Sequence, residues 1–105
     1  MLATFFEWKI RPGMEDRFRR CWDTITRLLH GEGSFGSALF TNHAGHFCAF
    51  AMWPDRETRD RAFAPFLENP TVHHLELREA IEREIQRMDL DCENDLWRLG
   101  RPQEK

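Results

Sequence analysis

The sequence predicts an α+β domain in which a four-stranded antiparallel sheet carries its helices on one face. Three observations lead to this fold class. Apolar and polar residues alternate near both ends of the chain, as expected for strands with two unlike faces. Apolar residues recur three and four positions apart in two intervening stretches, as expected for helices. Residues 46–53 are apolar at nearly every position, which is typical of a strand covered on both sides.

The length and composition are those of one domain. The 105 residues suffice for a single hydrophobic core, and 41% hydrophobic residues, nine Phe and four Trp among them, can fill it. We place the domain at residues 1–99 and expect a frayed tail at residues 100–105, where no pattern remains.

Charge and cysteine usage narrow the class of partner and compartment. The formal net charge is −3, with acidic and basic residues interleaved, so no nucleic-acid partner is expected. The three cysteines are widely spaced in apolar surroundings, which favours free thiols and a cytoplasmic protein. No apolar run approaches about 18 residues and no leader pattern precedes residue 5, so we expect neither a membrane span nor a signal peptide.

The first strand and first helix follow from their periodicities. At residues 4–10, Thr4, Phe6 and Trp8 share one face with Ile10, and a turn follows at residues 12–13. Residues 14–29 then place their apolar side chains at helical spacing until Gly31. This helix is long enough to lie along the sheet and cover it.

Residues 35–41 and 46–53 are predicted to form a hairpin, because the four residues between them are turn formers. Asp55 can cap the next helix, whose apolar side includes Phe63. Asn69 is expected to cap a further helical segment with Pro70 in its first turn, and Ile81 and Ile85 extend its buried stripe.

The last strand is expected around residues 87–96. An apolar face is expected to be shared by Met88, Leu90, Cys92 and Leu96. The acidic side chains between them, beginning with Asp89, are expected on the opposite, solvated face. The resulting order β-α-β-β-α-β is ferredoxin-like. Helices are available for one sheet face only, so we expect a second copy of the chain to cover the other, giving a homodimer.

Three segments carry a resemblance to a known family: residues 6–18 (FEWKIRPGMEDRF), 33–37 (GSFGS) and 50–55 (FAMWPD). Over residues 4 to about 99 the chain resembles the antibiotic biosynthesis monooxygenase-like family of the dimeric α/β-barrel superfamily. The resemblance implies sheets paired face to face in a homodimer and a pocket between sheet and helices. It also implies cofactor-independent oxidation of a flat aromatic or polyketide-like small molecule, with no cofactor in the site.

The catalytic residues of that family are incomplete here. Its quinone-forming members use a Trp that closes the third strand, matched by Trp53. They also use an Asn four residues earlier and a Tyr six residues later, where this chain has Ala49 and Arg59. The haem-degrading members use an Asn, a Trp and a His, of which only the histidine is matched, at about His73. A non-catalytic dimeric binding or regulatory module, and haem binding or degradation, therefore stay open as alternatives.

The candidate catalytic residues are Trp53, His73 and His74. Trp53 would lie at the pocket mouth and orient a ring, or else plug the end of the sheet. One of His73 and His74 would act as general base, or both are structural. His43 and His46 are too few ligands for a metal, so no metal site is predicted. The candidate substrate-binding residues are Phe6, Trp8, Ala49, Arg59 and Phe63.

Overall fold

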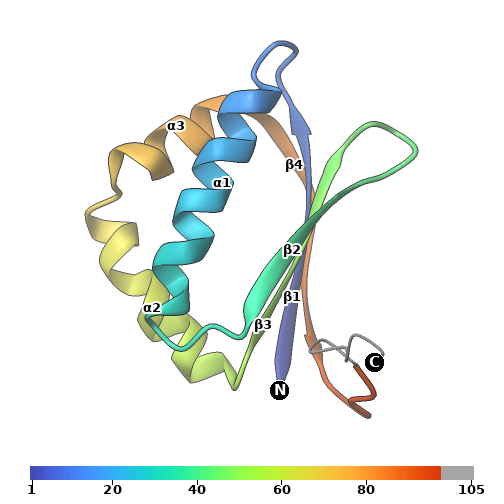
Figure 1. The fold of residues 1–105 in the computed structure, drawn as a ribbon, viewed down its shortest axis with the longest axis vertical. Helices are drawn as coiled ribbons and strands as arrows, with labels where there is room; N and C mark the ends of the chain where they lie inside the picture. Colours follow the sequence, from blue (N-terminus) through green and yellow to red (C-terminus); the bar gives the residue numbers. More distant parts are fainter. Residues whose placement is uncertain (98–105) are drawn as a thin grey trace, which may run out of the picture.

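The computed structural model describes residues 1–97, so the tail predicted at residues 100–105 lies outside the described residues. The elements are β1 (Leu2–Ile10), α1 (Glu15–His30), β2 (Gly36–Thr41), β3 (Phe47–Trp53), α2 (Arg56–Glu68), α3 (Val72–Ala80) and β4 (Ile81–Asp91). All strand pairs are antiparallel, in the order β2-β3-β1-β4. The three helices lie on one side of this sheet (Figure 1). The predicted ferredoxin-like α+β fold is confirmed.

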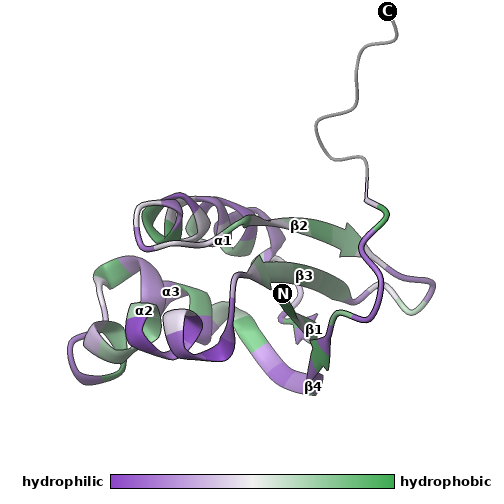
Figure 2. Cartoon of the chain, turned by 90° about the horizontal axis from the view of Figure 1, so that it is seen from below, coloured by the Kyte–Doolittle hydropathy of each residue, from purple (hydrophilic) through white to green (hydrophobic). Residues whose placement is uncertain are grey.

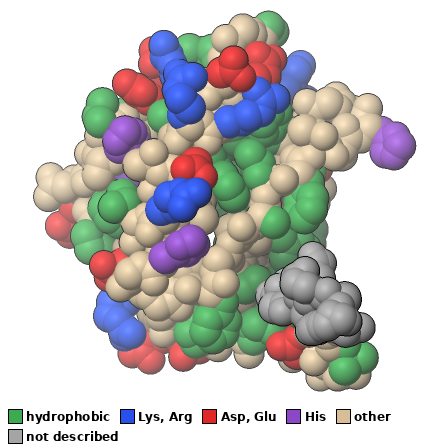
Figure 3. Space-filling model, in the orientation of Figure 1, with side chains coloured by type: hydrophobic (Ala, Val, Ile, Leu, Met, Phe, Trp, Pro, Cys, Tyr) green, Lys and Arg blue, Asp and Glu red, His purple; other side chains and the backbone are tan. Residues whose placement is uncertain are grey.

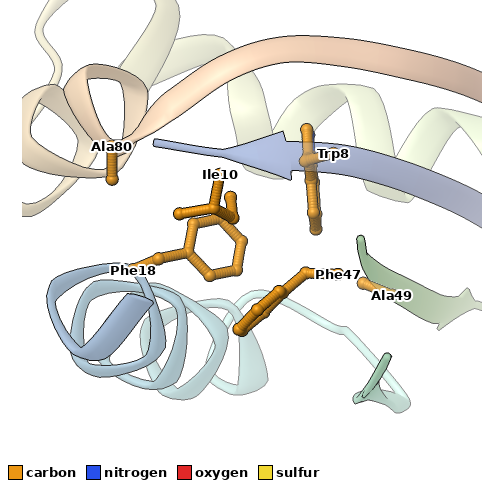
Figure 4. Packing of buried hydrophobic residues seen from close by; sticks show 6 residues of the cluster. All are labelled: Trp8, Ile10, Phe18, Phe47, Ala49 and Ala80. Atoms are coloured by element: carbon orange, nitrogen blue, oxygen red, sulfur yellow. The ribbon is translucent and has the colours of Figure 1, made fainter. Parts of the chain in front are cut away.

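Helix α1 is attached to the sheet by one deeply buried ring. Phe18 is fully buried, and its ring centroid lies 5.3 Å from that of Trp8 and 5.1 Å from that of Phe47. Figure 4 shows the ring reaching from α1 toward Ile10 and Phe47. The apolar face that the helical periodicity predicted is therefore the face of α1 that packs on the sheet.

A second apolar cluster lies around Trp53 and joins β1, β3, α1 and α2. Its buried members are Leu2, Ile25, Leu29, Trp53 and Ala62. Residues of both clusters also line the cavity described below, so the cavity is continuous with the core.

The second helical region differs from the prediction at both ends of α3. Thr71, not Asn69, caps this helix, because its side chain accepts a hydrogen bond from the His74 backbone N–H. The helix ends at Ala80, and Ile81 and Ile85 belong to β4. Pairing with β1 overrides the helical spacing there, since Ile81 lies opposite Ile10 in the sheet.

Strand β4 also ends earlier than predicted. Its last pair joins Asp91 to Leu2, the first residue of β1, and within residues 1–97 no partner strand extends the ladder to Leu96. Asp89 lies opposite Thr4 on the helix-facing side and is exposed, as predicted, but it is also paired with arginines. It accepts hydrogen bonds from Arg56 and Arg59 on α2. The apolar side of β4 faces the opposite way.

The sheet face without helices is apolar. Register places Phe5 between Phe50 and Met88 on this face. Phe40 on β2 also lies there, opposite Cys48, and exposes 55% of its surface. In Figure 2 strands β2 and β3 are largely hydrophobic along their length, whereas the helices carry hydrophilic residues. We refer to this surface, from Phe40 across Phe50 and Phe5 to Met88 and Leu90, as the open face.

The helical side of the molecule has a different character. In Figure 3 acidic and basic side chains are interspersed over it, and hydrophobic side chains show between the helices and the sheet. No helix within residues 1–97 is both long and apolar enough to cross a membrane.

Candidate functional site

A cavity of about 540 Å³ lies between the helices and the helix-facing side of the sheet. Its volume falls in the range of small-molecule sites. All four strands contribute to one wall, and α1, α2 and α3 supply the other. The lining is mainly aromatic and aliphatic, and its large side chains include Phe6, Trp8, Trp22, Trp53, Phe63, Phe66 and Leu77.

The structure brings nearly all of the predicted site residues to this cavity. Its lining includes Trp53, His74, Phe6, Trp8, Ala49, Arg59 and Phe63. His73 is the one predicted site residue outside it, because α3 turns the neighbouring His74 inward. Sequence alone could not choose between two adjacent histidines on a helix whose start was misplaced.

Trp53 lies in the cavity wall, not at its mouth as predicted. It exposes 1% of its surface, and its ring packs against Phe63 with centroids 5.8 Å apart. The indole Nε1 is buried and has no hydrogen-bond partner among the described residues. The same holds for Ser37 Oγ and His74 Nε2. All three residues line the cavity, and because buried polar atoms are nearly always paired in proteins, these three unpaired atoms are candidate partners for a ligand.

His74 is held by the cap of its own helix. Its Nδ1 lies 2.7 Å from Thr71 Oγ1 and 3.4 Å from the Thr71 backbone nitrogen. The imidazole stacks on Phe66 with a centroid distance of 4.6 Å. Burial lowers the pKa of His74 below its ordinary value, and the charges of Arg78 and His73 act in the same direction. The ring is therefore neutral at neutral pH.

An ionic network forms another part of the wall. Arg59 on α2 donates to Asp89 on β4, to Asp60, and to Thr4 Oγ1 at 2.9 Å. The hydrogen bond from Arg59 is the main reason that the pKa of Asp89 is lowered. An anionic substrate at Arg59 would have to compete with two carboxylates that this guanidinium already binds.

Several lining residues were missed by the sequence analysis. Ser37 lies on β2 opposite Ala51, and Phe66 lies one turn after Phe63 on α2. Strand parity and helical spacing were sufficient signals for both. Arg87, whose guanidinium lies 5.1 Å above the Phe6 ring, could not be found before β4 was placed beside β1.

A second polar cluster lies on the open face, away from the cavity. The carboxylate of Glu7 accepts hydrogen bonds from Gln86 Nε2 at 2.8 Å, His46 Nδ1 at 2.7 Å and Asn42 Nδ2 at 2.9 Å. These donors lower the pKa of Glu7 to about 2. His43 is exposed in the hairpin. Across residues 1–97, no three His, Cys, Asp or Glu side chains form a group that could hold a metal ion.

Comparison with known proteins gives similarity at the level of structure. No family model and no curated protein sequence matches the chain. Among solved structures, SnoaB, a cofactor-independent oxygenase from Streptomyces nogalater, is 19% identical with a TM-score of 0.69, covering 90% of this chain and 96% of that one. A structure described as an antibiotic biosynthesis monooxygenase is 23% identical with a TM-score of 0.64, covering 90% and 100%.

A protein from Mycobacterium tuberculosis is 18% identical with a TM-score of 0.71, covering 91% of this chain and 98% of that one. At these identities the likeness shows the fold. The resemblance to antibiotic biosynthesis monooxygenases that the sequence motifs indicated is confirmed at that level.

Proposed function

We propose that this chain binds a flat, largely apolar molecule in the cavity between sheet and helices and acts on it as a cofactor-independent, monooxygenase-like protein. The observation that carries the proposal is the cavity itself. The cavity has a volume of about 540 Å³ and a mainly aromatic and aliphatic lining, and three of its lining residues have a buried polar atom without a partner among the described residues. The fold shared with a cofactor-independent oxygenase supports the same class of reaction.

The proposed reaction needs only the substrate and molecular oxygen. A ring ketone with a CH₂ conjugated to it across the ring loses a proton from that CH₂, and the resulting enolate transfers electrons to O₂. A C–O bond forms, and loss of water leaves a second carbonyl: R₂CH₂ + O₂ → R₂C=O + H₂O. In this proposal Trp53 orients the ring, and His74 interacts with the oxygen or proton that changes charge.

Anthrone under air is a direct test, because its product anthraquinone is followed by absorbance. We expect oxidation above the uncatalysed rate, and a loss of about 10²-fold or more in His74→Ala. His43→Ala, which changes an exposed hairpin imidazole, is the matched control and should keep the wild-type rate. A loss of the same size in His73→Ala, with His74→Ala active, would contradict the role given to His74.

A second function is a non-catalytic binding or regulatory module. The observation that favours it is the type of residue found at two positions of the cavity wall. Ala49 and Arg59 stand where quinone-forming members of the resembled family carry Asn and Tyr, and Arg59 is occupied by Asp89 and Asp60. Binding without turnover distinguishes this function. A flat ligand at 100 times its Kd should add about 2.7 kcal/mol to the free energy of unfolding while oxygen consumption stays at background.

Haem is not the ligand that the cavity favours. Of the Asn, Trp and His that the haem-degrading members use, only the histidine is matched, at about His73, and His73 lies outside the cavity lining. A Soret band on adding hemin, absent in His74→Ala, would contradict this assignment.

The open face supports a proposal about assembly. Phe40, Met88 and Leu90 are exposed there around the less exposed Phe5 and Phe50. A contiguous apolar surface of this kind is uncommon on a monomer. We propose that the same face of a second copy covers it, which gives a homodimer with the two cavities on its outer sides.

A further inference from the structure

We propose that His74 acts in the cavity as a hydrogen-bond donor through Nε2–H, together with Trp53 Nε1–H, so that the cavity selects flat ligands carrying an acceptor oxygen. The inference rests on the proposed function, because it needs a ligand in this cavity. It gives His74 the opposite polarity from the general base that the sequence indicated.

The cap of α3 determines which ring nitrogen carries the hydrogen. The Thr71 backbone N–H donates to Nδ1 of His74, and a backbone amide has no other role in a hydrogen bond than donor. Nδ1 must therefore present its lone pair. Thr71 Oγ1 accepts from the His74 backbone N–H, which leaves its own hydrogen free to point at Nδ1, 2.7 Å away.

In a neutral imidazole, a lone pair on Nδ1 requires the hydrogen on Nε2. The ring is neutral because burial opposes its protonation. Nε2–H is thus a donor, and it is buried without a partner in a side chain that exposes 9% of its surface. Thr71 is the positioning residue that sets this polarity, and the stack on Phe66 holds the ring plane.

The unpaired hydrogen-bonding capacity of the wall is biased toward donors. Trp53 Nε1 can only donate, and Ser37 Oγ can donate or accept. The lining carboxylates are already bound by arginines: Asp89 and Asp60 by Arg59, and Glu84 by Arg87. A ligand that brings a carbonyl or a deprotonated hydroxyl oxygen pairs these donors, whereas a pure hydrocarbon leaves them unpaired and loses affinity.

Fluorene and 9-fluorenone form a matched pair of probes. Both are rigid tricyclic molecules of nearly the same size, and only the second carries an acceptor oxygen. We expect wild-type protein to bind fluorenone about tenfold more tightly than fluorene, as measured by quenching of tryptophan fluorescence. His74→Phe keeps a ring against Phe66 but removes the donor, and Trp53→Phe keeps an aromatic wall but removes the N–H together with part of the indole ring.

Each of these variants should reduce the fluorenone-to-fluorene affinity ratio about two- to tenfold with little effect on fluorene itself. A merely structural role of His74 would lower stability and leave the ratio unchanged. His43→Phe is the matched control and should keep the wild-type ratio. Circular dichroism confirms that each variant is folded before its ratio is used.

Two results would overturn the inference. One is an equal affinity of the wild-type protein for both probes, which leaves the proposed ligand cavity standing. The other is a ¹⁵N NMR spectrum of the imidazole that places the hydrogen of His74 on Nδ1; this measurement needs no ligand. If neither probe binds, the proposed function fails as well, so the two failures are distinguishable.

Discussion

The carboxylate of Glu7 is buried on a sheet face that is otherwise apolar, where three side chains donate hydrogen bonds to it. An unpaired buried charge would be costly, and these donors replace the water that it loses. The cluster ties the β2–β3 hairpin, through Asn42 and His46, to β1 and, through Gln86, to β4.

Glu7 predicts a specific dependence of stability on pH. Its pKa is about 2 in the folded protein against an ordinary value of 4.5, so the unfolded chain binds more protons between these values. The stability contributed by Glu7 is therefore fully present above about pH 4.5 and is lost as the pH falls toward 2. Urea unfolding from pH 7 to pH 2.5 should show a smaller acid loss in Glu7→Gln than in wild type.

Glu32→Gln, at an exposed position after α1, is the matched control and should follow the wild-type curve. If Glu7→Gln lost as much stability in acid as wild type, the hydrogen bonds at this carboxylate would not be responsible.

Phe18 carries the packing of α1 on the sheet. Because its ring is fully buried between Trp8 and Phe47, Phe18→Ala should lower the free energy of unfolding by about 3–5 kcal/mol. Chemical denaturation measures the loss. Leu28→Ala on the same helix, where 44% of the side chain is exposed, should cost far less, and equal losses would contradict this account of the core.

At the scale of elements, helix α3 depends on its capping box. Thr71 and His74 satisfy each other's backbone N–H groups, and loss of such a cap typically costs about 1 kcal/mol. Thr71→Ala should lower the free energy of unfolding by about that amount, and Thr71→Ser, which keeps the hydroxyl, should lower it by much less. Denaturant titration of both variants measures the difference. If Thr71→Ala had the same free energy of unfolding as wild type, the cap would not contribute to stability.

The boundary between α3 and β4 is determined by β1, a strand that is distant in sequence. Residues 72–85 carry one continuous helical spacing of apolar residues in the sequence. The helix nevertheless stops at Ala80, whose carbonyl accepts a hydrogen bond of 2.8 Å from the Arg11 N–H, and the chain continues as a strand beside β1. Strand pairing of this kind overrides local periodicity because every backbone group in the ladder gains a partner.

For the whole molecule, the open face predicts the oligomeric state. Phe40→Asp places a charge on that face and should convert the proposed dimer into a monomer in sedimentation velocity at micromolar concentration. Leu28→Asp, an equally drastic change on the outer side of α1, should leave the dimer intact. A wild-type protein that is folded and monomeric under these conditions would show that the face is tolerated in water.

Strand and helix periodicities determined the fold class, the faces of β1 and α1, the hairpin, and the cavity-facing positions of Phe6, Trp8, Ala49 and Phe63. These features are local or depend on parity, so the order of residues along the chain suffices for them. The same parity indicated an apolar second face on β3, from which the proposal of a dimer comes.

Only the tertiary structure decided which partner each polar group found. It turned Asp89 toward Arg59, surrounded Glu7 with donors from the β2–β3 turn and from β4, and chose His74 over His73 for the cavity. Such contacts join residues as far apart as Glu7 and Gln86, and their geometry depends on strand register and on where a helix begins. Hydrogen-bond partners and protonation states depend on distances between atoms in space. These distances are set only when the chain folds, so they cannot be read from the order of the residues.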